Sequence, residues 1–173
     1  MSSTLLVPIA EADAVTSPYW PAWEPPKARG VPAHVSVLFP FLRRRALTDE
    51  ALARIAEAAA TVPPFTVTFR RTGRFERTVF LVPEPARPFA ELTRRIVERF
   101  PDCPPYRGAH GDVLSPHLTV LTCADDEALE RAEAEVRRSL PLRAHVRELW
   151  LMIEDEHGGW RRHRSFPLGP ASR

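Results

Sequence analysis

Two short stretches of the sequence carry an imidazole and a hydroxyl at the same spacing. His34 is followed two positions later by Ser36, and His117 is followed two positions later by Thr119. Residues two apart on an extended strand project to the same face, so each stretch places an imidazole beside a hydroxyl. An imidazole exchanges protons near neutral pH, and a hydroxyl donates hydrogen bonds to phosphate oxygens. Two such pairs facing one another predict a phosphate site with a proton donor on one side and an acceptor on the other.

The two stretches together are more informative than either alone. In both of them apolar residues flank the hydroxyl, and these residues are expected to point the other way, into the core. A third match, His163 with Ser165, has Arg164 and Phe166 in the flanking positions, and we interpret it as chance. For each histidine taken singly, the alternative is a core residue whose ring bonds a backbone carbonyl.

Both motifs open a unit with the same order of expected elements. Each unit runs strand, helix, strand, turn, strand, the first over roughly residues 33–82 and the second over roughly 116–168. Two copies of one unit predict a bilobal, duplicated α+β fold, with the units facing each other across a pseudo-two-fold axis. We expect two mainly antiparallel sheets facing a central cleft, helices packed outside, and a single domain over residues 1–173.

The individual elements follow from capping residues and periodicity. Thr48 is a suitable N-cap for one helix, Pro88 stands in the first turn of a second, and Asp125 and Asp126 open a third. The first of these helices is expected to bury Leu52, Ile55, Ala56 and Ala59. Strands are expected at 5–9, 33–39, 65–69, 78–82, 117–122, 144–153 and 160–168, with turns at Gly73 and at 157–159.

The composition excludes several classes of protein. The 173 residues carry 24 Lys plus Arg against 22 Asp plus Glu, and this net charge of +2 excludes a bulk electrostatic binder of nucleic acid. Cys103 and Cys123 provide neither a disulfide framework nor a zinc site. No apolar run approaches the ~20 residues of a membrane span, and the first residues do not resemble a signal peptide. We therefore expect a cytoplasmic protein, a monomer, that uses no membrane, metal or cofactor.

The sequence around both motifs resembles the 2H phosphoesterases, and within them the 2′-5′ RNA ligase-like and cyclic phosphodiesterase group. The signature of that family is a pair of His-x-Thr/Ser-x motifs on facing strands of a bilobal α+β fold. His34-Val-Ser36-Val and His117-Leu-Thr119-Val match it, and GVPAHVSVLFPF and FPDCPPYRG followed by PHLTV are similar in context. Ser36 departs from the commoner threonine and lacks the methyl group that stiffens χ1. The resemblance covers residues 5–169.

This resemblance implies hydrolysis or formation of a phosphodiester without a metal, typically the opening of a 2′,3′-cyclic phosphate. It implies that His34 and His117 are the catalytic acid and base, in an order left open, and that Ser36 and Thr119 bind the nonbridging oxygens. The implied ligand is an RNA terminus or a nucleotide with a cyclic phosphate. Two alternatives stay open: a non-catalytic protein that binds phosphates or RNA ends, and a 2′-5′ RNA ligase that runs the same chemistry in reverse.

Aromatic and basic residues near the motifs are further candidates for contacts with the ligand. Phe39 and Phe41 follow the first motif and Tyr106 precedes the second, where a ring can stack on a base. Trp20 and Trp23 are weaker candidates of the same kind. Two arginine clusters are candidates for a basic rim, with a solvated surface as the alternative. They comprise residues 43–45 and Arg161, Arg162 and Arg164.

Overall fold

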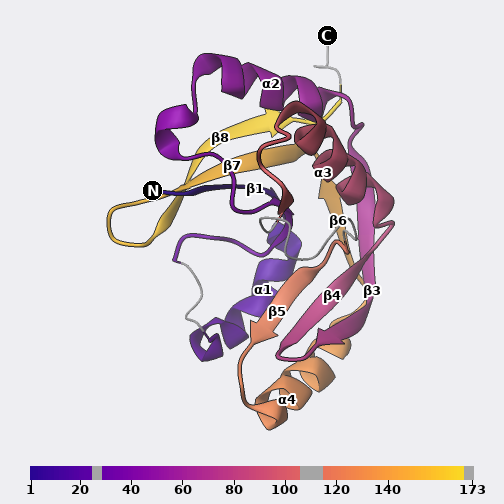
Figure 1. Cartoon of the computed structure of the whole chain (residues 1–173). Helices are drawn as coiled ribbons and strands as arrows, with labels where there is room; N and C mark the ends of the chain where they lie inside the picture. The colour runs from indigo at the N-terminus through magenta and orange to yellow at the C-terminus, as the bar shows by residue number, and fades with distance from the viewer. Residues whose placement is uncertain (25–28, 106–114, 170–173) are drawn as a thin grey trace.

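The computed structural model describes residues 1–24, 29–105 and 115–169, in which eight strands form one sheet (Figure 1). The strand order is β6-β3-β4-β5-β2-β1-β7-β8, and every neighbouring pair is antiparallel. The strands are β1 (Ser3–Pro8), β2 (His34–Leu38), β3 (Phe65–Phe75), β4 (Thr78–Glu84), β5 (Leu118–Thr122), β6 (Leu142–Val146), β7 (Glu148–Glu154) and β8 (Trp160–Pro167). The helices are α1 (Asp13–Thr16), α2 (Asp49–Ala60), α3 (Arg87–Arg99) and α4 (Asp126–Arg137). Within the described ranges no helix combines the length and the apolarity needed to cross a bilayer.

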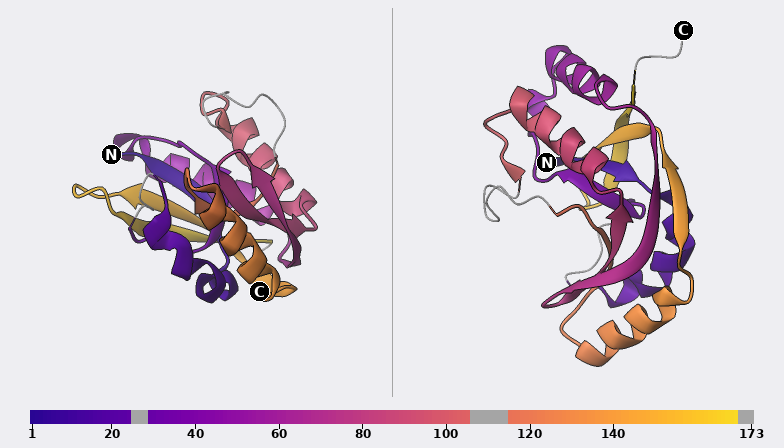
Figure 2. Two further views of the ribbon diagram at one scale, coloured as in Figure 1. Left: turned by 90° about the horizontal axis from the view of Figure 1, so that it is seen from below. Right: turned by 90° about the vertical axis from the view of Figure 1, so that its right-hand side faces the viewer.

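The sheet consists of two four-stranded halves that meet at the motif strands. Between β5 and β2 the register contains one residue pair, Val35 with Leu118, whereas every other neighbouring pair of strands has at least four. The sheet is strongly curled (Figure 2). The expected α+β fold with antiparallel strands is confirmed, while the two expected sheets are halves of one continuous sheet.

Each half of the sheet takes elements from both units of the sequence. In the first unit, β2 and α2 lie in the half formed by β2, β1, β7 and β8, whereas the β3–β4 hairpin lies in the other half. The second unit is divided in the same way, since β5 and α4 pack with β3 and β4 while the β7–β8 hairpin joins β1 and β2. The motif strand of each unit is therefore separated from the hairpin of that unit.

The two expected N-caps are present. The Thr48 hydroxyl accepts a hydrogen bond from the backbone N–H of Ala51 at 3.2 Å and so begins α2. The Asp125 carboxylate accepts from the N–H groups of Glu127 and Ala128 at 3.0 and 3.2 Å and begins α4. Both helices thus start where the local sequence satisfies their unpaired N–H groups.

Apolar side chains on one face of the sheet form one core with the helices. The strand residues of this core include Val35, Val37, Leu118 and Val120. The helices contribute, among others, Ile55, Leu92 and Leu129. In α2 the expected Ala56 is exposed and Ala58 is buried in its place. Because α2, α3 and α4 pack on the core side, they leave the opposite side of the motif strands to the solvent.

The stretch expected as one strand at 144–153 is two strands in different halves of the sheet. β6 pairs with β3, whereas β7 pairs with β1 and β8, so the chain crosses between the halves at Arg147. The Arg147 carbonyl accepts a hydrogen bond from the N–H of Leu168 at 2.8 Å. The alternation of Leu142, Ala144 and Val146 ends at the charged residues Arg147 and Glu148, and a continuous apolar run follows, so the sequence does mark this break.

Gly73 was expected in a turn and lies within β3 instead. It pairs with Phe80 of β4, and the turn follows at residues 76–77. A Cβ at Gly73 would lie 2.5 Å from ring carbons of Phe80, so the aromatic ring occupies the space that any other residue would need. Gly158, in contrast, has a φ of +73° and forms the expected turn between β7 and β8.

Candidate active site

The imidazoles and hydroxyls of the two motifs share one side of two neighbouring strands. In both motifs the imidazole and the hydroxyl are partly exposed, and the apolar residues after each of them are buried. We call the exposed side of the sheet the site face and define it by His34, Ser36, His117 and Thr119. The alternation expected from the sequence is therefore present in both stretches.

The register between β2 and β5 brings the two motifs together. Val35 pairs with Leu118 in an antiparallel arrangement, and both side chains are fully buried. If this register is continued by one residue in either direction, each imidazole falls opposite the hydroxyl of the other motif. Side chains directly opposite in such a pair have Cβ atoms about 4.5–5.5 Å apart. The site face thus gathers two imidazoles and two hydroxyls into one small patch.

Both imidazoles are held by the same type of hydrogen bond. Nδ1 of His34 lies 2.8 Å from the carbonyl oxygen of Pro32, and Nδ1 of His117 lies 2.8 Å from the carbonyl oxygen of Ser115. A carbonyl only accepts hydrogen bonds, so Nδ1 carries the proton in both rings. Nε2 is then the nitrogen that gains and loses a proton, as a base when the ring is neutral and as an acid when it is charged. The carbonyl bond expected of a core histidine occurs here in two partly exposed rings on the site face.

Each motif is followed by a β-bulge at the same position. Leu5 pairs with Leu38 and Leu6 with Ser36, so β2 carries one extra residue directly after its hydroxyl. In β5 the pairs Val79–Leu121 and Phe80–Thr119 leave one extra residue at the same place. Bulges increase strand twist and re-aim side chains. The shared Val-Leu ending of both motifs therefore corresponds to a shared local geometry.

Two phenylalanines beside His117 belong to the site face and were not predicted. The rings of Phe75 and Phe80 have their centroids 5.2 and 5.3 Å from that of His117, and they stack on each other at 4.4 Å. The sequence places Phe80 only within the expected strand at 78–82 and does not single out its ring. The signal that would identify it is the pairing of Phe80 with Gly73 across the hairpin, which depends on a register that periodicity alone does not define.

The family model of the 2′-5′ RNA ligase superfamily matches residues 6–158. The chain belongs to the 2′-5′ RNA ligase superfamily. Solved structures with a similar fold include TT0787 of Thermus thermophilus, at 17% identity with a TM-score of 0.68 over 99% of this chain and 100% of that chain. Escherichia coli LigT complexed with 3′-AMP is 16% identical, with a TM-score of 0.61 over 98% of both chains. No curated protein sequence matches the chain. The resemblance to the 2H phosphoesterases is thereby confirmed.

The aromatic candidates differ in their positions in this member of the 2′-5′ RNA ligase superfamily. Phe39 is 41% exposed and lies 6.2 Å from Trp160 between ring centroids. Phe41 is 7% exposed and packs edge-on against Phe100 at 5.1 Å, so its ring is occupied by the core and presents no face to a ligand. Tyr106 lies outside the described residues.

The two tryptophans of the early segment are both partly buried. Trp23 donates its indole N–H to the carbonyl of Val120 at 2.9 Å, on β5, and is partly buried against the core. Trp20 is also partly buried. On the site face the sequence reasoning missed Trp150, which lies in one register row with Leu6 and Ser36 and has the Arg162 guanidinium 4.6 Å from its ring centroid.

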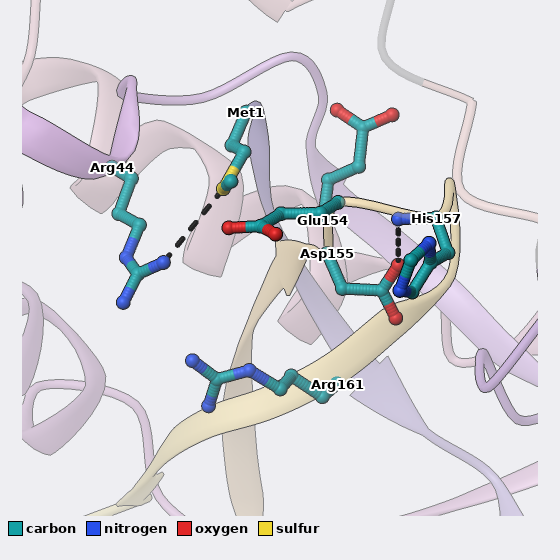
Figure 3. A pocket seen from close by; sticks show the side chains of 7 residues that line it. Met1, Arg44, Glu154, Asp155, His157 and Arg161 are labelled. Carbon is teal, nitrogen blue, oxygen red and sulfur yellow. Dashed lines mark hydrogen bonds between the residues drawn. The ribbon is translucent and has the colours of Figure 1, made fainter.

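The two arginine clusters approach each other at the β7–β8 hairpin. Arg44 and Arg161 line a pocket of about 250 Å³ with Met1, Glu154, Asp155, Glu156 and His157, and neither motif histidine is part of it (Figure 3). Its three carboxylates offset the positive charge. Burial, followed by the charges of Arg161, Arg164 and Arg44, holds the pKa of His163 below its usual value. The described residues contain no group of three or more His, Cys, Asp or Glu placed to bind a metal ion.

Proposed function

We propose that the chain is a metal-independent phosphodiesterase that opens a 2′,3′-cyclic phosphate, or hydrolyses a 2′-5′ phosphodiester, of an RNA end or nucleotide. The observation that carries this proposal is the equal tethering of two imidazoles through Nδ1, in strands whose register sets each ring opposite a hydroxyl. Escherichia coli LigT, which has a similar fold, was crystallised with 3′-AMP, ATP and NADP+. Those complexes support a nucleotide or an RNA end as the ligand.

In the proposed reaction the two histidines act on opposite sides of the phosphorus. The neutral imidazole accepts a proton from water at Nε2 while the water oxygen attacks phosphorus in line with the departing ribose oxygen. The bond between phosphorus and that ribose oxygen breaks, and the opposing imidazolium donates its Nε2 proton to the oxygen. Each Nδ1 keeps its proton throughout, because the carbonyl of Pro32 or Ser115 accepts it.

The hydroxyls supply the electrostatic part of the mechanism. Ser36 and Thr119 donate hydrogen bonds to the nonbridging phosphate oxygens, where negative charge develops in the transition state. Donors held on strands need little reorganisation when the charge appears. Ligation of 2′-5′ ends would use the same groups with a 5′-hydroxyl in place of water: its oxygen attacks the phosphorus of a 2′,3′-cyclic phosphate, one imidazole accepts its proton, and the other donates a proton to the departing 3′-oxygen.

Proton transfer is what separates this proposal from simple binding of a phosphate. A protein that only bound a phosphate would be served by arginine, which offers planar, bidentate donors and a permanent charge. Two imidazoles that share one tautomer add an acid and a base, which binding alone does not use. This favours an enzyme over a non-catalytic binder of RNA ends.

The test is turnover of 2′,3′-cyclic nucleotides and 2′-5′ dinucleotides by the wild type and by His34→Ala and His117→Ala, with EDTA present. We expect full wild-type activity in EDTA and a loss of about 100- to 10,000-fold in kcat/KM for either variant. His163→Ala is the matched control, because it removes the third His-x-Ser histidine, which lies on β8 rather than in either motif strand. A cleaved RNA is included to detect ligation.

Three results would contradict the proposal in different ways. Undiminished turnover by the double alanine variant removes the histidines from the chemistry. Tight nucleotide binding without turnover of any phosphodiester identifies a binding protein. Activity that EDTA abolishes and a divalent cation restores contradicts the metal-independent mechanism.

A further inference from the structure

Phe75 is a large apolar side chain left open to solvent beside His117. It is 47% exposed, and within the described ranges only Met1 and Phe39 are other large hydrophobic residues with comparable exposure. Its ring stacks on Phe80 with an interplanar angle of 29° and meets the His117 ring nearly edge-on, at 86°. One face of Phe75 is thus used inside the protein, and the ring keeps a large surface in contact with water.

The neighbouring residues hold this ring in place. Phe80 lies opposite Gly73 on β3 and opposite Thr119 on β5, which puts it on the site face next to the second motif. Because Gly73 has no side chain, the Phe80 ring lies across β3, with only 8% of Phe80 exposed. Phe75 is two residues from Gly73 on the same face of β3 and stacks on Phe80. The pair is therefore a fixed aromatic stack whose outer member is Phe75.

We propose that the outer face of Phe75 is a stacking platform for the nucleobase of the substrate, an inference that rests on the proposed function. The base and the 2′,3′-phosphate of a nucleotide are attached to one ribose. When the phosphate lies between the two imidazoles, the base must therefore lie close to the site face, and a surface that binds it must be near one of the imidazoles. Phe75 has its centroid 5.2 Å from that of His117 and provides this surface. Its stack on Phe80 fixes the ring before the ligand arrives, which lowers the entropic cost of binding.

The platform predicts the type of selectivity. All four bases have a π-face, so stacking on phenylalanine recognises a nucleobase without reading its hydrogen-bonding edge. We therefore expect acceptance of all four bases, and poor binding of cyclic phosphates that lack one. The ligand class is a nucleoside phosphate or an RNA end, as opposed to a small phosphodiester without a base.

The experiment compares a 2′,3′-cyclic nucleotide with 1-O-methylribose 2,3-cyclic phosphate, which keeps the phosphate and ribose but has no base. Phe75→Ala is expected to raise KM for the nucleotide about 5- to 150-fold, the range that corresponds to loss of one stacked base. Its effect on KM and kcat for the baseless substrate should be much smaller than its effect on KM for the nucleotide. Phe75→Leu keeps apolar volume without a π-face and should behave like alanine, whereas Phe75→Trp should restore the wild-type KM.

Two controls separate stacking from a structural role. Glu76→Ala, at the exposed turn beside Phe75, tests whether any change in the hairpin affects the assay. If Phe75→Ala reduces turnover of both substrates equally, the ring serves to pack His117 and the platform is wrong. If Phe75→Leu keeps the wild-type KM for the nucleotide, apolar volume accounts for the effect and the platform is also wrong.

Binding measurements keep this inference separate from the proposed function. Calorimetric titration with a nucleoside 3′-monophosphate and with inorganic phosphate requires no turnover. We expect Phe75→Ala to weaken binding of the nucleotide by the same 5- to 150-fold, estimated at about 1–3 kcal/mol of stacking, and to leave phosphate binding unchanged. Equal nucleotide affinity in the wild type and Phe75→Ala overturns the platform even if the enzyme is active. If the wild type turns over no phosphodiester but Phe75→Ala binds the nucleotide more weakly than the wild type, the proposed function is wrong and the stacking platform stands.

Discussion

The strands β2 and β5 carry the same local structure in different surroundings. Both contain a histidine whose Nδ1 donates to the carbonyl two residues earlier, at 2.8 Å in each case. Both have a partly exposed hydroxyl followed by a bulge. On their outer sides, however, β1 sets Leu6 opposite Ser36, whereas β4 sets Phe80 opposite Thr119. Leu6 is fully buried, while Phe80 supports the exposed ring of Phe75.

This difference separates two tasks that a symmetric fold would otherwise share. In the proposed mechanism, proton transfer and phosphate binding need matched groups on both sides of the phosphorus, and the two motifs would supply them. Recognition of a base needs one surface on one side, and we propose that the aromatic stack beside His117 is that surface. Two equal motifs with aromatic residues beside only one of them would suit a substrate that has one phosphate and one base.

The largest expected effect concerns the two histidines as a unit. His34→Ala and His117→Ala should each lower kcat/KM by about 100- to 10,000-fold. The kcat/KM of the double variant should be no more than about tenfold below that of the less active single variant. The acid and the base act in one step, so the free-energy losses of the two substitutions do not add. The check is single-substrate kinetics on a 2′,3′-cyclic nucleotide. Fully multiplicative losses would show that the two rings act in separate steps.

The hydroxyls come next and compare the two motifs directly. Ser36→Ala and Thr119→Ala should each lower kcat by about 100-fold, since each removes one donor to the developing charge. Ser36→Thr should retain activity, because it keeps the hydroxyl and adds the methyl group that restricts χ1. Steady-state kinetics of the three variants measure this. Equal activity of Ser36→Ala and the wild type would leave Thr119 as the sole phosphate donor.

The aromatic stack is tested by adding one methyl group. Gly73→Ala places a Cβ 2.5 Å from the Phe80 ring, and the displaced ring should cost about 1–3 kcal/mol of unfolding free energy. Displacement of the ring beside His117 should also lower kcat/KM about 10- to 100-fold. Gly158→Ala is the control in the other half, because its φ of +73° predicts a cost of about 1–2 kcal/mol with no neighbour within 4 Å. Urea unfolding should show that both variants are less stable than the wild type. Steady-state kinetics should show a lower kcat/KM for Gly73→Ala only.

The smallest expected effect is a decline of stability at alkaline pH that comes from one contact, between Tyr19 and Glu135 of α4. Burial and a hydrogen bond to the Glu135 carboxylate at 2.7 Å raise the pKa of Tyr19 from 10.0 to about 12. Above pH 10 the unfolded chain loses this proton while the folded chain keeps it, so stability falls between pH 10 and about 12. Tyr19→Phe should remove that part of the decline in urea midpoints. An unchanged decline would place the alkaline transition elsewhere.

The parts of the fold that were predicted are those encoded by neighbouring residues. The caps Thr48 and Asp125 and the alternation around His34 and His117 are local patterns with local causes. The break at Arg147 was missed although the alternation of apolar residues stops at Arg147 and Glu148, because both segments are strands and only their partners differ. Whether a strand joins one half of the sheet or the other is decided by pairing with distant strands, which a single sequence does not display.

The candidate site was predictable only as far as the motifs extend. Phe41 looked equivalent to Phe39, but it is buried and packs against Phe100 in the core. Phe75 and Phe80 gave no signal because their role depends on Gly73 across a hairpin. A glycine within an apolar strand is, in retrospect, the residue that marks a close approach of an aromatic ring.

The central claim is that the two imidazoles form one acid and base pair, and the pH dependence of kcat/KM tests it most directly. The wild type should give a bell-shaped profile on a 2′,3′-cyclic nucleotide, since one ring must be neutral and the other charged. His34→Ala and His117→Ala should each retain a residual activity that lacks one limb, and the missing limb should differ between them. A wild-type profile with a single limb, or the same limb missing in both variants, would contradict the account.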